Sequence, residues 1–417
     1  MTALTNWAGN VTFAAARVHR PTSVPEVQEL VAGSTRLRAL GSGHSFSPVA
    51  DTDGDLVLLG DLPPRCDVSD DDATVTVSSG LRYGDIAPLL HEAGLALPNL
   101  GSLPHICVAG AAATGTHGSG DANPPLASSV VGLEVVTADG ALLHLDETDP
   151  RFPGAVVSLG TIGVVTAVTL RVEPSFDVAQ TVYDRLPMDA LAAYLDEVFV
   201  SAYSVSVFST LRSDVADQVW LKRRTDRTYP DLGDDWLGAT RADGPRHPVP
   251  GGSADSCTEQ LGRPGPWFER LPHFRLDHRP SSGAELQSEF LVPREHAAAA
   301  VEAVRTIAEV VAPPLQVAEL RTVAADDRWL SMAQGRDSLA LHFTWHPDPA
   351  AALTAVLAVE QALAPLAARP HWGKVFAMTP EQVQPLYPRL ADARALRHEL
   401  DPHDVFGNAF VERYVGR

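Results

Sequence analysis

The sequence predicts an α+β protein with two domains, the second built on an antiparallel sheet flanked by helices. The chain has 417 residues, more than one simple core usually supports. Strand and helix patterns alternate through residues 1–175. From about Phe176 the strands each have one polar and one apolar side, with apolar helices between them. We therefore expect one domain over residues 1–175, a second over 176–368, and a closing segment over 369–417 that returns to the first domain and lines the site.

The composition is that of a soluble globular protein, with 45% hydrophobic and 20% charged residues. The sequence has no run of eighteen apolar residues and no basic, apolar start, so we expect neither a membrane span nor a signal peptide. Its three cysteines, Cys66, Cys107 and Cys257, lack the spacing of metal ligands. A sparse, odd number of cysteines is typical of a reducing compartment, which predicts a cytoplasmic protein without a bound metal.

The formal net charge of −20 narrows the choice of ligand. Nucleic acids and anionic membranes are bound through Lys and Arg contacts, so neither is expected as a partner. A neutral small molecule is the better candidate substrate. The pyrophosphate of a cofactor would have to be held largely by backbone N–H groups and helix ends.

The first domain begins with a helix signal at Ser23. Ser23 can cap the helix, Glu26 would complete a capping box, and Pro25 is tolerated in the first turn. The elements expected after it are strands at residues 36–40, 55–59 and 73–78 and a helix at residues 83–93.

A glycine-rich loop, GSGHSF at Gly41–Phe46, ends the first of these strands and presents His44. A dinucleotide-binding fingerprint needs a third glycine that opens a helix, but Phe46 occupies that position and Pro48 follows. The Gly-Lys-Ser/Thr of a phosphate-binding P-loop is also absent from the sequence. Taken alone, the loop is as consistent with a glycine turn that binds nothing as with a ligand-binding turn.

Two further segments of small residues change this balance. Leu97–Gly120 is rich in Gly, Ala, Ser and Thr, and Ala155–Val165 carries Gly160 and Gly163 before an alternating strand at 164–172. Small residues let the backbone approach a ligand closely and offer N–H donors. Three such loops suit a long, flat, anionic ligand held along its length. The alternative is three ordinary turns.

Three strand patterns in the second domain place polar side chains on one side. They are Glu285–Glu289, Glu319–Arg321 and Leu339–Trp345. The polar side carries Gln287, Glu319, Arg321, His342 and Thr344, and the apolar side carries Leu286, Phe290, Leu320, Leu341, Phe343 and Trp345. This mixture, poor in Lys, predicts a pocket for a hydroxyl-rich ligand, although antiparallel sheets commonly have one solvated side.

Helices are expected to cover the apolar side of this sheet. One runs from Arg294 to Val311 with Val301, Val304, Ile307 and Val311 as its apolar stripe, and another from Pro349 to Leu366 with Leu353, Val356, Leu357 and Leu363. In the closing segment, Thr379 can cap a short helix opened by Pro380, and a second helix is expected at residues 388–400.

Several motifs resemble the FAD-binding domain of the vanillyl-alcohol oxidase superfamily. They are GSGHS at Gly41–Ser45, TGTHG at Thr114–Gly118 and SLGTIGVVT at Ser158–Thr166. The likeness to the alditol oxidases of that superfamily runs from NWAGN near the start through PNLGSLPHI, VWLKRRTDR, CTEQLGRPGPW and SSGAELQSE to RPHWGKVF near the end. It implies a PCMH-type FAD-binding domain over residues 1–175 and a substrate-binding cap domain over residues 176–368.

In that family the histidine of GSGHS carries FAD through the 8α-methyl group, so the resemblance implies that His44 is covalently bound to FAD. The residues implied to contact the cofactor are Gly41, Ser42, Gly43, His44, Ser45, Ser102, Cys107, Gly110, Thr114, Gly115, Thr116, His117, Gly163, Val164, Val165, His371 and Lys374. One departure is Cys107, where relatives usually have serine, because a thiol is a weaker hydrogen-bond partner.

The resemblance also implies a substrate site. Its residues are Ser102, Gln287, Glu319, Arg321, His342, Thr344 and Lys374. Lys374 and Arg321 are expected to bind the reacting oxygen and to stabilise an alkoxide there. Glu319 and His342 are both candidates for the base, and the residues alone do not choose between them.

The expected reaction is oxidation of the terminal CH₂OH of a polyol such as xylitol or sorbitol to the aldose, with O₂ reduced to H₂O₂. Gly101, a small residue before Ser102, leaves room for O₂ near the flavin. We expect a monomer. The alternatives are an aldonolactone oxidase or dehydrogenase of the same superfamily, and a flavin- or sugar-binding protein without turnover. The clustered charged and basic side chains argue against the second alternative, because pure storage does not need them.

Overall fold

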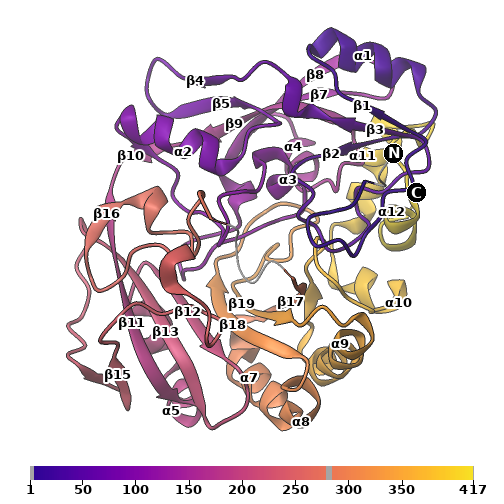
Figure 1. Ribbon diagram of the computed structural model, residues 1–417. Helices are drawn as coiled ribbons and strands as arrows, with labels where there is room; N and C mark the ends of the chain where they lie inside the picture. The colour runs from indigo at the N-terminus through magenta and orange to yellow at the C-terminus, as the bar shows by residue number, and fades with distance from the viewer. Residues whose placement is uncertain (1–3, 279–283, 417) are drawn as a thin grey trace.

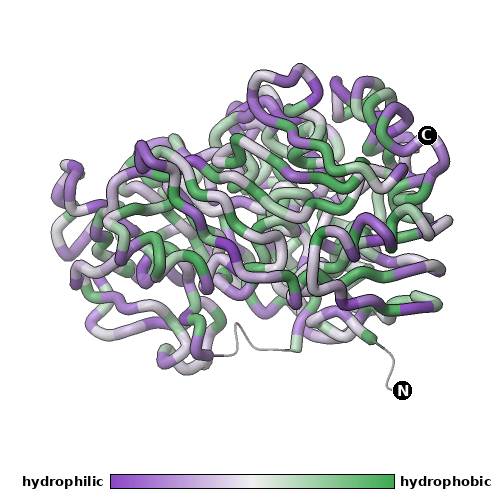
Figure 2. The backbone as a smooth tube through the Cα atoms, turned by 90° about the horizontal axis from the view of Figure 1, so that it is seen from above, coloured by the Kyte–Doolittle hydropathy of each residue, from purple (hydrophilic) through white to green (hydrophobic). Residues whose placement is uncertain are grey.

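The computed structural model describes residues 4–278 and 284–416 and confirms the α+β class (Figure 1). The N-terminal part of the chain forms the upper half of the molecule in Figure 1, and one large sheet with its helices forms the lower half. The C-terminal segment, drawn in yellow, runs back to the upper half. Seen from above, hydrophobic stretches run through the body of the molecule, and hydrophilic stretches mark many of the peripheral loops (Figure 2).

The upper half contains two main sheets. A three-stranded parallel sheet has the order β1 (Arg17–His19), β3 (Asp55–Leu58), β2 (Leu37–Leu40). A five-stranded antiparallel sheet has the order β4 (Cys66–Val68), β5 (Thr74–Ser78), β9 (Val164–Arg171), β7 (Val130–Val136), β8 (Leu142–Asp146). A short antiparallel pair is formed by β6 (Leu95–Ala96) and β10 (Glu173–Pro174). The expected strands of the first domain are therefore present.

The expected helices of the first domain are present too. They are α1 (Val24–Gly33) and α2 (Tyr83–Glu92), with the shorter α3 (Val108–Ala113) and α4 (Phe152–Val156) between later strands. The side chain of Ser23 caps α1 and accepts the N–H of Glu26. The expected capping box is incomplete, because Glu26 Oε2 accepts the N–H of Thr22 at 2.7 Å instead of that of Ser23.

The lower half is built on a ten-stranded sheet in which every described pairing is antiparallel. Its main order is β14 (Asp235–Trp236), β15 (Ala239–Arg241), β11 (Asp177–Pro187), β13 (Val215–Arg224), β12 (Ser204–Ser209), β18 (Leu315–Val323), β19 (Ser338–Trp345), β17 (Leu286–Pro293), β20 (Arg369–Pro370), and β16 (Pro264–Pro266) pairs with β11. The helices of this half are α5 (Met188–Ala193), α6 (Leu195–Val200), α7 (Ala297–Thr306), α8 (Ala308–Val311) and α9 (Pro349–Leu363).

Two helix predictions need correction. The helix expected from Arg294 to Val311 starts as a 3₁₀ turn and then divides into α7 and α8 at Ile307, which departs from helical geometry with ψ 13°. In α9, Val356 and Leu363 are buried as expected, but Leu353 and Leu357 are 45% and 51% exposed. The buried side of α9 is instead completed by Ala352, Ala355 and Val359. Small alanine side chains let the helix pack closely, which rotates the contact face away from the larger leucines.

By length and composition alone, Pro349–Leu366 could also cross a membrane, with a mean hydropathy of 1.4 over 18 residues. The core helix of a soluble protein passes the same test. Here the segment packs beside α7, α8 and β17.

The closing segment contains α10 (Pro380–Val383), α11 (Leu390–Leu400) and α12 (Ala409–Tyr414). Thr379 caps α10 in a full capping box with Gln382, as its sequence predicts. The segment is then hydrogen-bonded to the upper half: Val405 O accepts the N–H of Leu37 at 2.7 Å, and Asn408 Nδ2 donates to Val49 O at 3.0 Å. The end of the chain thus holds the strand and loop that carry the GSGHS motif.

Candidate active site

A cavity of about 600 Å³ lies where the two halves meet. The upper half contributes the loop after β2, the turn before α2, the small-residue segment around α3, and the turn before β9. The lower half contributes the polar side of β17, β18 and β19, and the closing segment adds residues 371–374. Nearly all the predicted cofactor and substrate residues line this one cavity. The predicted members are Gly41, Ser42, Gly43, His44, Ser45, Ser102, Cys107, Gly110, Thr114, Thr116, His117, Gly163, Val165, Gln287, Glu319, Arg321, His342, Thr344, His371 and Lys374.

Two residues predicted to contact the cofactor, Gly115 and Val164, do not line the cavity, although their chain neighbours do. Val164 is fully buried in a separate core cluster with Val57 and Phe406, because side chains alternate along β9 and only Val165 faces the site. Gly115 has a φ of +71°, and a Cβ at this position would lie 3.1 Å from Met332 Cε. The position of Gly115 beside Met332 leaves no room for a larger side chain, and the cofactor contacts of Gly115 and Val164 stay predictions.

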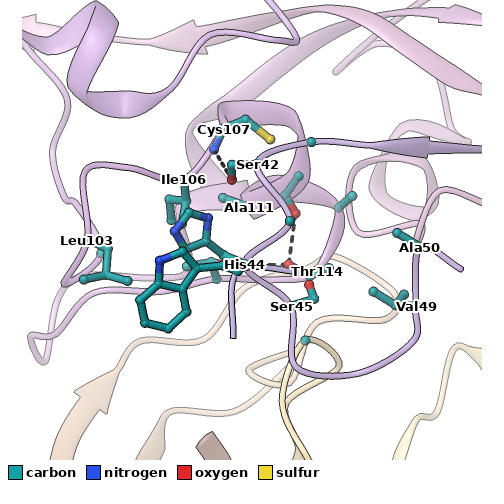
Figure 3. A pocket seen from close by; sticks show the side chains of 18 of the residues that line it. Ser42, His44, Ser45, Val49, Ala50, Leu103, Ile106, Cys107, Ala111 and Thr114 are labelled. Carbon is teal, nitrogen blue, oxygen red and sulfur yellow. Dashed lines mark hydrogen bonds between the residues drawn. The ribbon is translucent and has the colours of Figure 1, made fainter. Parts of the chain in front are cut away.

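The GSGHS loop and the segment around α3 form one wall of the cavity (Figure 3). Ser42 Oγ accepts the backbone N–H of Cys107 at 3.1 Å. A Cβ built on Gly41 would lie 2.1 Å from Cys107 Sγ, and one built on Gly110 would lie 2.8 Å from the same atom. Only glycine fits at position 41 while this sulfur is in place, so the backbone of the GSGHS loop packs directly against the Cys107 side chain.

His44 lies in this wall beside the N-terminal NWAGN segment. Its ring stacks on that of Trp7, with centroids 5.5 Å apart. Trp7 N donates to Gly43 O at 2.7 Å, and Asn6 Nδ2 donates to Ser45 O at 2.9 Å, so the segment supports the loop on both sides of His44. Burial lowers the pKa of His44 to about 4. The ring is therefore neutral, and its buried Nδ1 has no hydrogen-bond partner among the described residues.

The upper part of the cavity fits FAD. Its glycine-rich walls leave room for a flat group, and Arg20, Arg38 and Arg82 also line it. Positive side chains and small-residue loops suit an anionic pyrophosphate. The unpartnered Nδ1 of His44 is the kind of buried polar atom that a bound group would satisfy. The described residues contain no group of three or more His, Cys, Asp or Glu side chains that could hold a metal ion.

The lower part of the cavity is the polar side of the sheet, and it is buried. All residues of β18 and β19 are buried, which excludes the solvated alternative for these strands. Strand register brings Gln287 opposite Thr344 and places His342 between Glu289 and Glu319. The predicted polar residues therefore meet because neighbouring antiparallel strands pair in this register.

Lys374 reaches the same place from the closing segment. Val375 N donates to Gln287 O at 2.8 Å, which holds the segment against β17. Gln287 Oε1 accepts from Lys374 Nζ and lies 3.1 Å from His342 Nε2, and Gln287 Nε2 donates to Glu285 Oε1 at 2.5 Å. Gln287 thus connects the lysine and the histidine. Burial lowers the pKa of Lys374 and lowers that of His342 to about 3.

A buried ion-pair cluster occupies the centre of the polar side. Arg321 Nη2 donates to Glu289 Oε1 at 2.6 Å, and Arg321 Nε lies 3.5 Å from Glu319 Oε1. His117 Nε2 lies 3.2 Å from Glu289 Oε1, and His273 Nε2 lies 2.8 Å from Glu319 Oε1. Burial would raise the pKa of both carboxyls, but Arg321 and the neighbouring histidines hold them well below their usual range. Both carboxylates are therefore charged and are weak bases.

Sequence reasoning missed two residues of this cluster. Glu289 lies on the polar side of β17 two positions after Gln287, so strand alternation carried a signal for it. His273 lies in the LPHF segment at residues 271–274, after the 3₁₀ turn at Trp267–Glu269 and before β17. This segment has no periodic pattern of apolar residues that would mark His273. Trp7, Phe46, Arg82 and Ile106 also line the cavity and were not predicted.

Comparison with known proteins identifies relatives along the whole chain. The signature described as an FAD binding domain matches residues 15–146, and that described as D-arabinono-1,4-lactone oxidase matches residues 284–414. The chain is 51% identical over 413 residues to a Streptomyces sp. protein named alditol oxidase, with 98% of each chain covered. It is 30% identical to L-gulono-1,4-lactone dehydrogenase of Mycobacterium tuberculosis, covering 99% of this chain and 98% of the relative.

Among solved structures, the fold is similar to that of cholesterol oxidase from B. sterolicum. The TM-score is 0.81 at 15% sequence identity, with 99% of this chain and 96% of that chain covered. At this identity the likeness concerns the fold alone.

Proposed function

We propose a reaction for this chain from one premise: it belongs to the alditol oxidase family of FAD-dependent enzymes. The reaction is oxidation of the terminal primary alcohol of a polyol, such as xylitol or sorbitol, to the aldose, with O₂ reduced to H₂O₂. The observation that carries the proposal is that one cavity joins a glycine-lined wall with an unpartnered His44 Nδ1 to a buried polar sheet with Arg321 and Lys374. Such a cavity can hold a flavin above and several hydroxyl groups below.

FAD, when bound, supplies the hydride acceptor and passes the electrons on to O₂. The side chains below it bind and orient the alcohol. Gln287, Thr344 and Ser102 offer hydrogen-bonding groups for the hydroxyls along the substrate, and a site built this way rejects analogues that lack them. Arg321 and Lys374 are donors for the reacting oxygen and stabilise the negative charge that develops there.

The two candidates for the base differ in their contacts. Glu319 is held between Arg321 and His273, which both contact its Oε1, so we assign it the orientation of Arg321. His342 is buried and neutral, and its Nε2 lies 3.1 Å from Gln287 Oε1. An amide oxygen can only accept, so a neutral His342 donates from Nε2 to Gln287. We propose its other ring nitrogen, Nδ1, as the acceptor of the hydroxyl proton, because His342, unlike Glu319, is not held in an ion pair with any residue that the structure describes.

We further propose that His44 is covalently bonded to the 8α-carbon of FAD through Nδ1. The support is that Nδ1 is buried, unpartnered among the described residues and in a cavity wall, on a ring that burial keeps neutral. In acid-precipitated wild-type protein the yellow colour should stay in the pellet, and in His44→Ala it should be released. A colourless wild-type pellet contradicts the bond.

The substrate is tested by anaerobic mixing, since a true substrate bleaches the flavin absorbance. Xylitol should bleach it, and admission of air should then release H₂O₂. The second candidate function is oxidation of an aldonolactone, which the match of residues 284–414 to the D-arabinono-1,4-lactone oxidase signature favours. Bleaching by gulono-lactone but not by xylitol would establish that candidate. Absence of bleaching with every polyol and lactone would indicate a binding protein, whereas bleaching without peroxide would indicate a dehydrogenase.

A cytoplasmic, monomeric protein is also proposed. The three cysteines Cys66, Cys107 and Cys257 are free, which is compatible with a reducing compartment. Cell fractionation and sedimentation of the purified protein test the two statements separately.

A further inference from the structure

A buried series of contacts runs from Lys222 to the ion-pair cluster, and the reaction proposed above assigns no role to Lys222. Lys222 lies on β13, is 1% exposed and does not line the cavity. Its Nζ lies 2.5 Å from Leu271 O, 3.1 Å from Pro272 O and 3.0 Å from His273 Nδ1. An ammonium group has three N–H donors and no acceptor, so the three acceptors match it one to one.

This contact determines where the proton of the His273 ring lies. Because the Lys222 ammonium can only donate, Nδ1 must accept, and a neutral His273 then carries its proton on Nε2. That nitrogen lies 2.8 Å from Glu319 Oε1, so it donates to the carboxylate. The backbone is fixed as well, since His273 N donates to Ser102 O at 3.0 Å and His273 O accepts from Thr258 N at 2.9 Å.

The charges of this series balance without a charge on the histidine. Burial lowers the pKa of Lys222 to about 7, so below that pH Lys222 and Arg321 are positive, and Glu319 and Glu289 are negative. Burying an unbalanced charge is costly, so a second proton on His273 would be disfavoured while Lys222 is charged. Burial and Lys222 together lower the pKa of His273 to about 4, in agreement with a neutral ring. Cys257, the remaining titratable group near Lys222, stays a neutral thiol because burial raises its pKa to about 12.

We propose that Lys222 is a positioning residue for the reaction: by donating to Nδ1 it keeps His273 neutral with its proton on Nε2, and His273 in turn holds Glu319 beside Arg321. Lys222 never touches the substrate. The proposal rests on the proposed function in that Arg321 binds the reacting oxygen. It predicts that, when Lys222 is removed, His273 takes up the missing charge as an imidazolium.

The test compares Lys222→Met with Lys222→Met/His273→Gln. Glutamine can donate to Glu319 but cannot carry the charge. In Lys222→Met the anaerobic rate of flavin reduction by xylitol should be retained at low pH, where His273 is an imidazolium. The rate should fall about tenfold as pH rises through the pKa that His273 has in this variant. The reason is that the hydrogen bond from His273 to the Glu319 carboxylate weakens when the ring loses its charge. In the double variant this ionisation should disappear and the rate should stay low at all pH values.

A measurement without substrate separates this proposal from the proposed function. As pH rises over the same range, the thermal midpoint of Lys222→Met should fall relative to that of the double variant. If xylitol does not reduce the wild-type flavin but this midpoint shift is present, the proposed function fails and the role of Lys222 stands. If Lys222→Met shifts neither the midpoint nor the rate profile relative to the double variant, Lys222 only fills space and the proposal is overturned. Should Lys222→Met not fold, Lys222→Leu, which also lacks a donor to Nδ1, gives the same comparison.

Discussion

The pair of Glu289 and Arg321 offers a test of whether charge balance holds the site together. The two side chains are 2% and 7% exposed, and their hydrogen bond is 2.6 Å long. Glu289→Gln keeps the shape of the side chain but leaves Arg321 with Glu319 alone. Removing one partner of a buried ion pair costs about 3–5 kcal/mol of stability, because the other charge remains buried and uncompensated.

For a domain of the size of the lower half, such a loss lowers the thermal midpoint by roughly 6 °C or more. Wild-type and variant holoproteins should be heated at one scan rate and followed by flavin fluorescence. The control is Asp189→Asn, whose carboxylate lies 2.9 Å from Arg305 but is 89% exposed. A surface pair contributes little, so the control should barely move the midpoint.

The pH dependence has a defined sign. Burial would raise the pKa of Glu289, but Arg321 and His117 hold it well below its ordinary value of 4.5. The stabilisation is therefore complete above that ordinary value and is lost as pH falls towards the pKa in the folded protein. The midpoint gap between wild type and Glu289→Gln should be constant above about pH 5.5 and should close at lower pH. A gap no larger than that of the control, or one that persists in acid, refutes the reasoning.

Three further variants test other parts of the site. Lys374→Met should retain FAD and slow anaerobic flavin reduction by about 100-fold, because a donor to the developing alkoxide is lost; an unchanged rate at saturating xylitol would contradict this role. Gly41→Ala should be purified with little FAD, since the new Cβ would lie 2.1 Å from Cys107 Sγ, whereas the control Gly33→Ala meets nothing within 4 Å and should keep its flavin absorbance. Arg38→Met removes buried donors to Gly160 O and Phe406 O and should speed proteolysis of the closing segment; an unaltered cleavage rate would show that this segment is held by other contacts.

Local patterns in the sequence were sufficient for much of the fold. Ser23 and Thr379 cap their helices because each cap depends on residues within one turn of the chain. Strand alternation separated the polar side of the lower sheet from the apolar side, since the two-residue period is a property of the extended backbone itself. Small residues at Gly41–Ser45 and Leu97–Gly120 marked the cofactor wall for the same local reason: their backbone is open to close approach.

Contacts between distant segments were decided by the tertiary structure. His273 and Glu319 are 46 residues apart and meet only because a loop is bonded to Ser102 beside β18. Val164 turns away from the cavity and α9 packs through alanines, because burial depends on what lies across the interface and not on the hydrophobicity of a stripe alone. The sequence by itself determined which side chains share a strand or a loop. Only the packed structure decided which of them pair, because each buried charge must find its partner in three dimensions.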